Sequence, residues 1–203
     1  QHTYSAPGAY MVIITDGTTK LAKSAIVLGP GAKLYADTFT GDGVLHGRAL
    51  ETGGLTWVSD GLAISDGVLA ASSYYAAGLT TVEAQTNIAF AFDVMVTGTA
   101  DVLVGRSRTG IKKTSDNSQF AIVVAADRIK KIGVAETPYM LTSSISGVWT
   151  PVTVRMLGSV ATVKVGTESS FADLPGPNAA QRMAAISLSG TGANAENFRM
   201  VTW

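Results

Sequence analysis

The sequence predicts an all-β protein, an antiparallel jelly-roll β-sandwich. Three observations predict this fold: apolar residues recur with a period of two, glycine-containing turns separate the runs, and helical patterns are scarce. The clearest alternating runs are 90–96, 120–124, 152–156 and 161–165. Because alternation places the large side chains on one side of an extended chain, each run is expected to form a strand with one buried face.

Turn sequences with glycine lie between these runs. They occur at Asp16-Gly17, Asp60-Gly61, Asp66-Gly67 and Leu157-Gly158-Ser159. Glycine readily adopts the positive φ that tight hairpins require. The clearest predicted hairpin places Asp66-Gly67 between the short strands 62–64 and 68–70.

One segment favours a helix. Residues 178–186 begin with an asparagine cap after Pro177 and consist mostly of alanine and other good helix formers. We expect about two helical turns here, an exception in a chain of strands.

Composition narrows the classes of function. The 203 residues contain 15 Lys and Arg, 15 Asp and Glu, and no cysteine. Balanced charge argues against a nucleic-acid partner, which requires clustered cations. The lack of cysteine excludes disulfides, cysteine-ligated metal centres and a thiol nucleophile. No apolar run reaches the length of a membrane span, so no membrane partner is predicted.

The sequence also suggests how the chain is divided. Gly29-Pro30-Gly31 marks a boundary between residues 1–31 and a main domain at 32–203. The first part has two strand patterns, which cannot bury a core by themselves. We therefore expect it to dock on the main domain, to pair with another chain or to belong to a longer domain.

The start of the chain resembles a known module. The run His2-Thr3-Tyr4-Ser5-Ala6-Pro7-Gly8-Ala9-Tyr10-Met11-Val12 is similar to a signature in the later part of PKD and related Ig-like modules. In that signature Pro-Gly makes a turn and the flanking aromatic residues pack into a sandwich. The resemblance implies a short Ig-like strand segment at the N-terminal end.

A second resemblance covers residues 34–203. It rests on Asp37-Thr38-Phe39, Leu45-His46-Gly47-Arg48, Trp57 and Gly67-Val68-Leu69-Ala70, and on the closing run Glu196-Asn197-Phe198-Arg199-Met200-Val201. These motifs resemble concanavalin A-like (laminin-G-like) jelly-roll domains, often found in tailed-phage structural proteins and bacterial surface proteins. This sandwich hosts lectins, hydrolases and inert structural modules.

The two resemblances together imply a function in a virion. We expect a non-enzymatic structural or display protein of a tailed phage, in the capsid, tail or fibre. Its expected partners are other virion proteins and further copies of itself in a homo-oligomer. The alternative is a carbohydrate-binding adhesion module that recognises host-surface polysaccharide, on the virion or on a bacterial surface.

Catalytic patterns are scarce in the sequence. None of the five glutamates has an acidic residue two or four positions away, so the paired carboxylates of a glycosidase do not occur along one strand. Carboxylates from different strands could still meet. The two histidines, His2 and His46, are not accompanied by a Gly-x-Ser-x-Gly motif. We therefore expect a protein that is not an enzyme.

Four aromatic residues are candidates for glycan binding. Tyr74, Tyr75, Tyr139 and Trp149 lie near predicted loops or strand ends, where a ring could stack on a sugar face. For the Tyr74-Tyr75 pair, the alternative is a contact between subunits. Trp57 and Trp203 are interpreted as packing residues.

The sequence predicts no cofactor, with calcium as the one candidate. Asp37 and Asp42 could supply carboxylate oxygens for a calcium ion in loops of a lectin-like sandwich. The alternative is that these aspartates cap turns through their own side chains.

Overall fold

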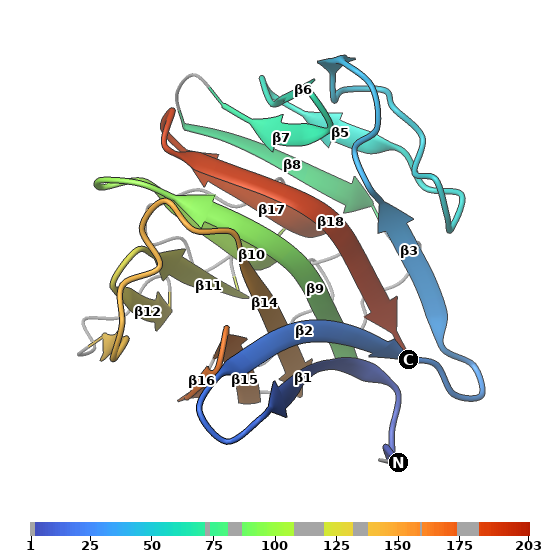
Figure 1. Cartoon of the computed structure of the whole chain (residues 1–203). Coiled ribbons are helices and arrows are strands. Elements are labelled where there is room, and N and C mark those ends of the chain that lie inside the picture. Colours follow the sequence, from blue (N-terminus) through green and yellow to red (C-terminus); the bar gives the residue numbers. More distant parts are fainter. Residues whose placement is uncertain are drawn as a thin grey trace.

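A computed structural model describes residues 3–71, 74–80, 87–107, 120–131, 138–158, 160–173 and 183–203. Within these ranges every helix or strand that forms is a β-strand. No helix that could cross a membrane is present among them. The strands build two stacked antiparallel sheets and a separate hairpin (Figure 1). The predicted all-β sandwich is therefore confirmed.

The first sheet has seven strands and forms the far layer in Figure 1. Its order is β13 (Tyr139–Met140), β12 (Arg128–Lys131), β11 (Phe120–Ala125), β10 (Asp101–Ser107), β17 (Met183–Ser189), β8 (Tyr74–Thr80) and β5 (Trp57–Ser59).

The second sheet has nine strands and forms the near layer. Its order is β16 (Glu168–Asp173), β15 (Val160–Val165), β14 (Thr150–Leu157), β9 (Asn87–Val96), β18 (Ala193–Thr202), β7 (Val68–Ala70), β6 (Ala63–Ser65) and β4 (Gly43–Val44), with β3 (Lys33–Asp37) also paired to β18.

The main core lies between the two sheets, and β9 shows how its strands are divided between two faces. Phe90 and Phe92 are fully buried in the main core, as the alternating pattern predicts. The intervening Ala89 and Ala91 belong to a separate apolar cluster on the outer face of the nine-stranded sheet. Small residues at these positions allow another element to approach that outer face closely.

A series of aromatic ring contacts crosses the main core from β5 to β9. Trp57 packs edge-on against Phe198, with 5.2 Å between ring centroids, and Phe198 packs against Phe90 at 6.2 Å. Such tilted and edge-to-face contacts stabilise a core beyond the area they bury. The predicted packing role of Trp57 is thus confirmed.

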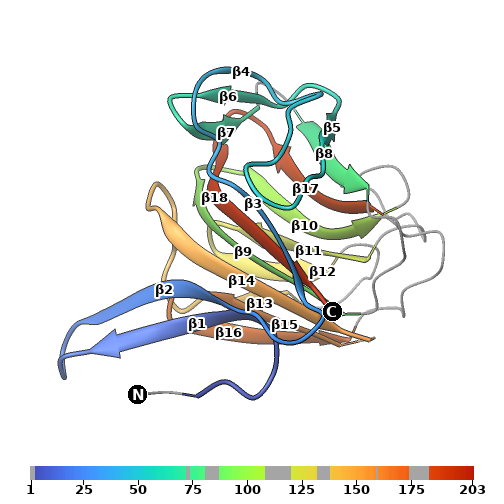
Figure 2. The ribbon, with the colours of Figure 1, turned by 90° about the vertical axis from the view of Figure 1, so that its right-hand side faces the viewer.

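The element that covers the outer face is the N-terminal hairpin, β1 (Gly8–Thr15) and β2 (Lys20–Val27). Ala9 packs on Ala89 and Ala91, and Ile26 and Trp203 pack against the same cluster. Figure 2 shows the hairpin lying across the nine-stranded sheet and extending past it. Docking on the main domain was the first of the three expected arrangements. A two-stranded hairpin has no core of its own, and its Ig-like identity stays a prediction.

The Asp66-Gly67 hairpin forms as predicted. It joins β6 to β7 with Ser65 opposite Val68, and both turn residues have positive φ, 52° for Asp66 and 77° for Gly67. Positive φ at both central positions is the requirement of a type I′ turn, whose twist matches that of the flanking strands.

The expected helix at 178–186 is wrong where the structure describes it. Residues 183–186 belong to β17, which pairs with β10 on one side and β8 on the other. Residues 178–182 lie outside the described ranges. Burial of Ala184 and Ile186 between two sheets outweighs the local preference of an alanine-rich run.

Candidate functional site

The residues of the Asp37 to Trp57 signature converge on one buried carboxylate. Oδ2 of Asp37 accepts hydrogen bonds from Nε1 of Trp57 at 2.8 Å and from Nε of Arg48 at 3.2 Å. Its Oδ1 accepts from Nη2 of Arg48 at 3.1 Å and from the backbone N–H of Phe39 at 2.8 Å. Arg48 thus engages both oxygens, which fixes the orientation of the pair.

This network makes Asp37 a structural residue. Both of its oxygens face donors, one of them a cation, so the prediction that Asp37 binds calcium is replaced by a buried salt bridge. Asp42 is exposed, and its Oδ1 accepts from the backbone N–H of Asp66 at 2.7 Å. That contact joins Asp42 to the β6–β7 turn, 24 positions away in the sequence, and is thus not the local turn cap that was the alternative to calcium. Among the residues that the structure describes, no three His, Asp or Glu side chains gather around a point where a metal could sit.

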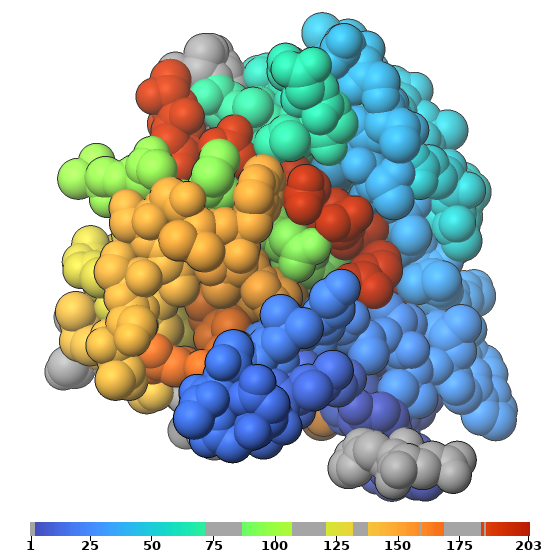
Figure 3. All heavy atoms as spheres, viewed as in Figure 1, coloured from blue at the N-terminus to red at the C-terminus, as the bar shows by residue number. Residues whose placement is uncertain are grey.

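A groove lies on the outer face of the nine-stranded sheet, on the β2 side of the hairpin. We call it the β2 groove; its volume is about 570 Å³. Its walls come from β2, β3 and the segment before β14, and its floor from β9 and β18. In the space-filling view the hairpin, in dark blue, stands against the surface of the sandwich (Figure 3).

Two carboxylates meet on the floor of the β2 groove. Asp93 on β9 lies directly opposite Glu196 on β18. The Nδ2 of Asn197 donates to Oδ2 of Asp93 at 2.9 Å and to Oε1 of Glu196 at 3.3 Å. Two acidic side chains therefore share one neutral donor, and no cation is paired with either of them in the described part of the chain.

A β-bulge produces this arrangement. The register between β9 and β18 shifts between Glu196 and Arg199, and Asn197 has a φ of 53°. Asparagine tolerates this left-handed conformation better than most residues. The extra residue lets Glu196 and Asn197 both line the groove, and bulges commonly redirect side chains in this way.

The environment changes the acidity of Glu196. Burial, and then the negative charge of Asp93, raise the pKa of the Glu196 carboxyl above its ordinary value. A carboxyl with a raised pKa beside a second carboxylate can act as a hydrogen-bond donor or acceptor under mildly acidic conditions.

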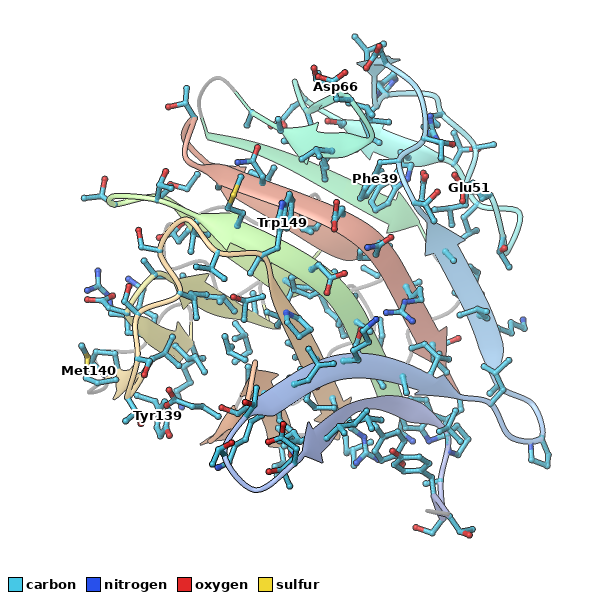
Figure 4. The ribbon with its side chains drawn as sticks, in the orientation of Figure 1. Phe39, Glu51, Asp66, Tyr139, Met140 and Trp149 are labelled. Carbon is cyan, nitrogen blue, oxygen red and sulfur yellow. The ribbon has the colours of Figure 1, made fainter. Side chains whose placement is uncertain are left out.

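Of the two residues predicted for glycan binding whose side chains the structure describes, Trp149 lines the β2 groove and Tyr139 does not. Its side chain is 37% exposed, and in Figure 4 it lies over the nine-stranded sheet, far from Tyr139. Tyr139 is 39% exposed on β13, in the other sheet. The backbone of Tyr74 and Tyr75 is in β8, also in the other sheet, and their side chains lie outside the described structure. Trp149 and Tyr139 therefore do not share one platform, and the part of the prediction that concerns Tyr74 and Tyr75 stays a prediction.

Sequence reasoning missed the floor of this groove. Asp93 and Asn197 are 104 positions apart, and the search along single strands could not bring them together. The available signal was the alternation in 90–96, which places Asp93 on the face opposite Phe90 and Phe92. An outward acidic residue on an otherwise apolar strand indicates a functional or solvated surface.

Comparisons with known proteins bear on the fold. No family model matches the sequence, and no curated protein matches it. Among solved structures, a Trypanosoma rangeli sialidase in complex with 2,3-difluorosialic acid matches with a TM-score of 0.56 at 9% identity, covering 94% of this chain and 33% of that chain. A mutant of this sialidase displaying trans-sialidase activity matches with a TM-score of 0.57 at 10% identity, covering 87% and 31%. The exoplasmic/lumenal domain of VIP36 in its Ca²⁺/Man3GlcNAc-bound form matches with a TM-score of 0.49 at 12% identity, covering 72% and 83%.

The two sialidase likenesses, with TM-scores above 0.5, support the antiparallel jelly-roll β-sandwich that the described strands form. They agree with the concanavalin A-like fold implied by the sequence motifs. The chain spans about a third of the length of the sialidase chains that it matches. At such low identity the likeness concerns fold and not chemistry. The phage origin of the chain stays a prediction.

Proposed function

We propose that this protein is a carbohydrate-binding module and that it holds glycan in the β2 groove. One observation carries the proposal: the exposed Trp149 borders a groove whose floor presents the carboxylates of Asp93 and Glu196 and the amide of Asn197. An aromatic ring packs on the apolar face of a sugar, and polar groups beside it pair with the hydroxyls.

The charges of the groove favour a neutral glycan. Lys23 and Arg199 line it together with Asp93 and Glu196, so its formal charges cancel. The Nη2 of Arg199 donates to Oγ of Ser24 at 2.5 Å, which ties the floor to the hairpin wall. Carboxylates that have no cationic partner accept hydrogen bonds from sugar hydroxyls well.

The groove has room for more than one sugar. A smaller hollow of about 290 Å³ adjoins it and shares Ala22, Trp149 and Pro151 with its lining. Trp149 therefore borders both spaces, where its ring can contact two successive units of a chain. We expect oligosaccharides to bind more tightly than monosaccharides.

The test is glycan binding by Trp149→Ala. We expect the substitution to weaken binding to a neutral oligosaccharide at least tenfold, the scale of about 1.4 kcal/mol that separates an anchoring aromatic from a neutral contact. A glycan panel followed by calorimetry measures the effect, and thermal unfolding checks that the variant is folded.

Tyr139→Ala is the matched control, because Tyr139 is similarly exposed and lines neither hollow. It should leave the affinity unchanged. Equal affinities for wild type and Trp149→Ala would contradict the proposal, as would an absence of glycan binding by the folded wild type.

A second candidate function is glycan hydrolysis, favoured by the juxtaposition of Asp93 and Glu196. Glycosidases use one protonated and one ionised carboxyl across the scissile bond, and the raised pKa of Glu196 fits the protonated partner. Release of reducing ends from a bound oligosaccharide, abolished in Glu196→Gln, would establish it. Binding without release would leave the module non-enzymatic.

The context in which such a module works is a separate proposal. The virion display function inferred from the sequence motifs predicts that the chain is incorporated into a phage particle. The hairpin tip, with Ile13, Ile14 and Leu21 exposed, is the surface that could contact other virion proteins. Loss of incorporation on changing these three residues to threonine would support this role, and normal incorporation would count against it.

A further inference from the structure

A second groove lies on the other side of the hairpin. We call it the β1 groove; its volume is about 620 Å³. One wall is β1 with the preceding residues 3–6, and the floor is the outer face of β14 and β15. It shares no lining residue with the β2 groove. The two grooves therefore flank the same hairpin and can be altered separately.

The floor of the β1 groove holds two cations and two hydroxyl groups. Arg155 lies opposite Thr162, and Thr153 lies opposite Lys164, so that the four outward side chains form a block across β14 and β15. None of the described residues that line the groove carries a carboxylate. Arg155 and Lys164 have no ion pair in the described structure, and their positive charges add in the groove.

The Arg155 guanidinium is held in place by packing. It lies over the ring of Tyr10 at 4.5 Å from the centroid, a cation–π contact. Its Nε is buried and has no hydrogen-bond partner among the described residues. A Cβ on Gly8 would lie only 3.1 Å from that Nε, so the glycine allows the close approach. The cation is thus preorganised, and a ligand that binds it need not order a flexible arginine.

From these observations we propose that the β1 groove is a second binding site, selective for a carboxylate-bearing saccharide. The carboxylate would lie between Arg155 and Lys164, where two positive charges lack a counter-charge. The hydroxyl of Thr162 would pair with a sugar hydroxyl, and Thr3 and Ser5 add two exposed hydroxyls, whereas Thr153 is almost fully buried beneath them. Hydroxyl side chains on both the hairpin wall and the floor of the groove favour a hydroxyl-rich ligand over an acidic peptide.

The site differs from the proposed neutral-glycan site in its charge. The β2 groove has two acidic and two basic side chains, whereas the β1 groove has two basic ones alone. The two sites stand on different residues, and failure at one does not decide the other.

The experiment compares two probes that differ by the carboxylate. Oligogalacturonate and the neutral galactose oligomer of the same length are titrated into the full chain by calorimetry at low and moderate salt. We expect oligogalacturonate to bind at least tenfold more tightly and to lose affinity as salt rises, because its contact is ionic. Lys164→Gln should weaken the binding of oligogalacturonate at least fivefold and leave the affinity for the neutral oligomer unchanged.

Three further variants test whether the effect is specific to the β1 groove. Lys33→Gln, at an exposed lysine of β3 that lines neither groove, should change nothing. Arg155→Gln serves as a second variant, with thermal unfolding to show that the hairpin stays docked. Trp149→Ala should leave oligogalacturonate binding at the β1 groove intact.

The proposal is overturned if Lys164→Gln leaves oligogalacturonate binding unchanged, or if the two oligomers bind equally to Trp149→Ala, in which the proposed neutral-glycan site is impaired. It is also overturned if a glutamate-rich peptide binds in a Lys164-dependent manner and oligogalacturonate does not, since the groove would then be a site for acidic peptide. Binding of acetate as strong as that of galacturonate would reduce it to a site for simple anions.

Discussion

Asp37 and the Asp93–Glu196 pair are acidic groups on opposite faces of the same sheet, and they differ in burial and in the number of hydrogen-bond donors around them. Asp37 faces inward, is fully buried, and receives four hydrogen bonds, two of them from Arg48. Asp93 and Glu196 face outward, are partly exposed, and share one amide donor. A buried carboxylate requires a full set of donors, whereas a groove carboxylate keeps acceptor capacity for a ligand.

The difference explains what the conspicuous motif residues do. The Asp37, Arg48 and Trp57 signature is the most recognisable part of the sequence, yet its side chains serve to hold β3 and the following loop against the core. The groove residues belong to no recognised motif. The strong sequence signature of this chain thus marks a stabilising network, and the proposed binding surface is found only from the sheet register.

The largest predicted effect falls on the inward carboxylate. Asp37→Ala removes the acceptor of the buried Trp57 N–H and of two Arg48 N–H groups, and it should lower the free energy of unfolding by about 3 kcal/mol. Asp93→Ala, the outward counterpart, should lower it by less than about 1 kcal/mol, the range of partly exposed sites. Chemical denaturation of both variants measures the contrast, and equal losses would remove the distinction between the two faces.

A smaller effect is expected at Gly8, where the hairpin meets the outer face. Its φ is 145°, and an added Cβ would lie 3.1 Å from Nε of Arg155, so Gly8→Ala should destabilise by about 1 kcal/mol or slightly more. Gly17→Ala, in the same hairpin, introduces backbone strain in open space and is the control for crowding. If Gly17→Ala is the more damaging of the two, close packing at Gly8 is not what holds the hairpin.

The smallest effects concern pH, and they have opposite signs for two glutamates. The folded state raises the pKa of Glu196, so it binds that proton more tightly than the unfolded state, and the resulting stability is lost as pH rises through the raised pKa. Hydrogen bonds from Thr38 outweigh burial and lower the pKa of Glu51, so its contribution is present at neutral pH and is lost as pH falls.

The free energy of unfolding of Glu196→Gln, relative to wild type, should therefore be higher at pH 7 than at pH 4. For Glu51→Gln the same difference from wild type should be lower at pH 7 than at pH 4. Each change should be less than about 0.5 kcal/mol. Thermal unfolding from pH 3 to pH 8 resolves the two trends. Parallel trends for the two variants would show that the groove pair does not differ from an ordinary hydrogen-bonded carboxylate.

Much of the fold follows from local sequence. Alternation predicted the strands that became β9, β11, β14 and β15, and turn chemistry predicted the β6–β7 hairpin. The expected helix is wrong at Met183–Ser189, because this segment is an interior strand. Its conformation is fixed by pairing with β10 and β8, and local helix propensity does not include that pairing.

The candidate site was harder to predict. Trp149 was identified from its residue type and place. The meeting of Asp93, Glu196 and Asn197 depends on one bulge between two strands, and Asp93 and Asn197 are 104 positions apart in the sequence. Arg155 and Lys164 meet by a hairpin register that the alternating pattern implied, yet only the docked β1 turns their surface into a groove.

The β1–β2 hairpin is a wall of both grooves, and this makes it a thermodynamic link between them. Any ligand that requires the docked hairpin stabilises the docked state in proportion to its own occupancy. A ligand bound in one groove would reduce the opening of the hairpin and so raise the affinity of the other groove for its ligand. By reciprocity, the second ligand would raise the affinity for the first by the same factor. A small element with no core of its own would in this way let two chemically different saccharide surfaces be recognised together more tightly than either alone.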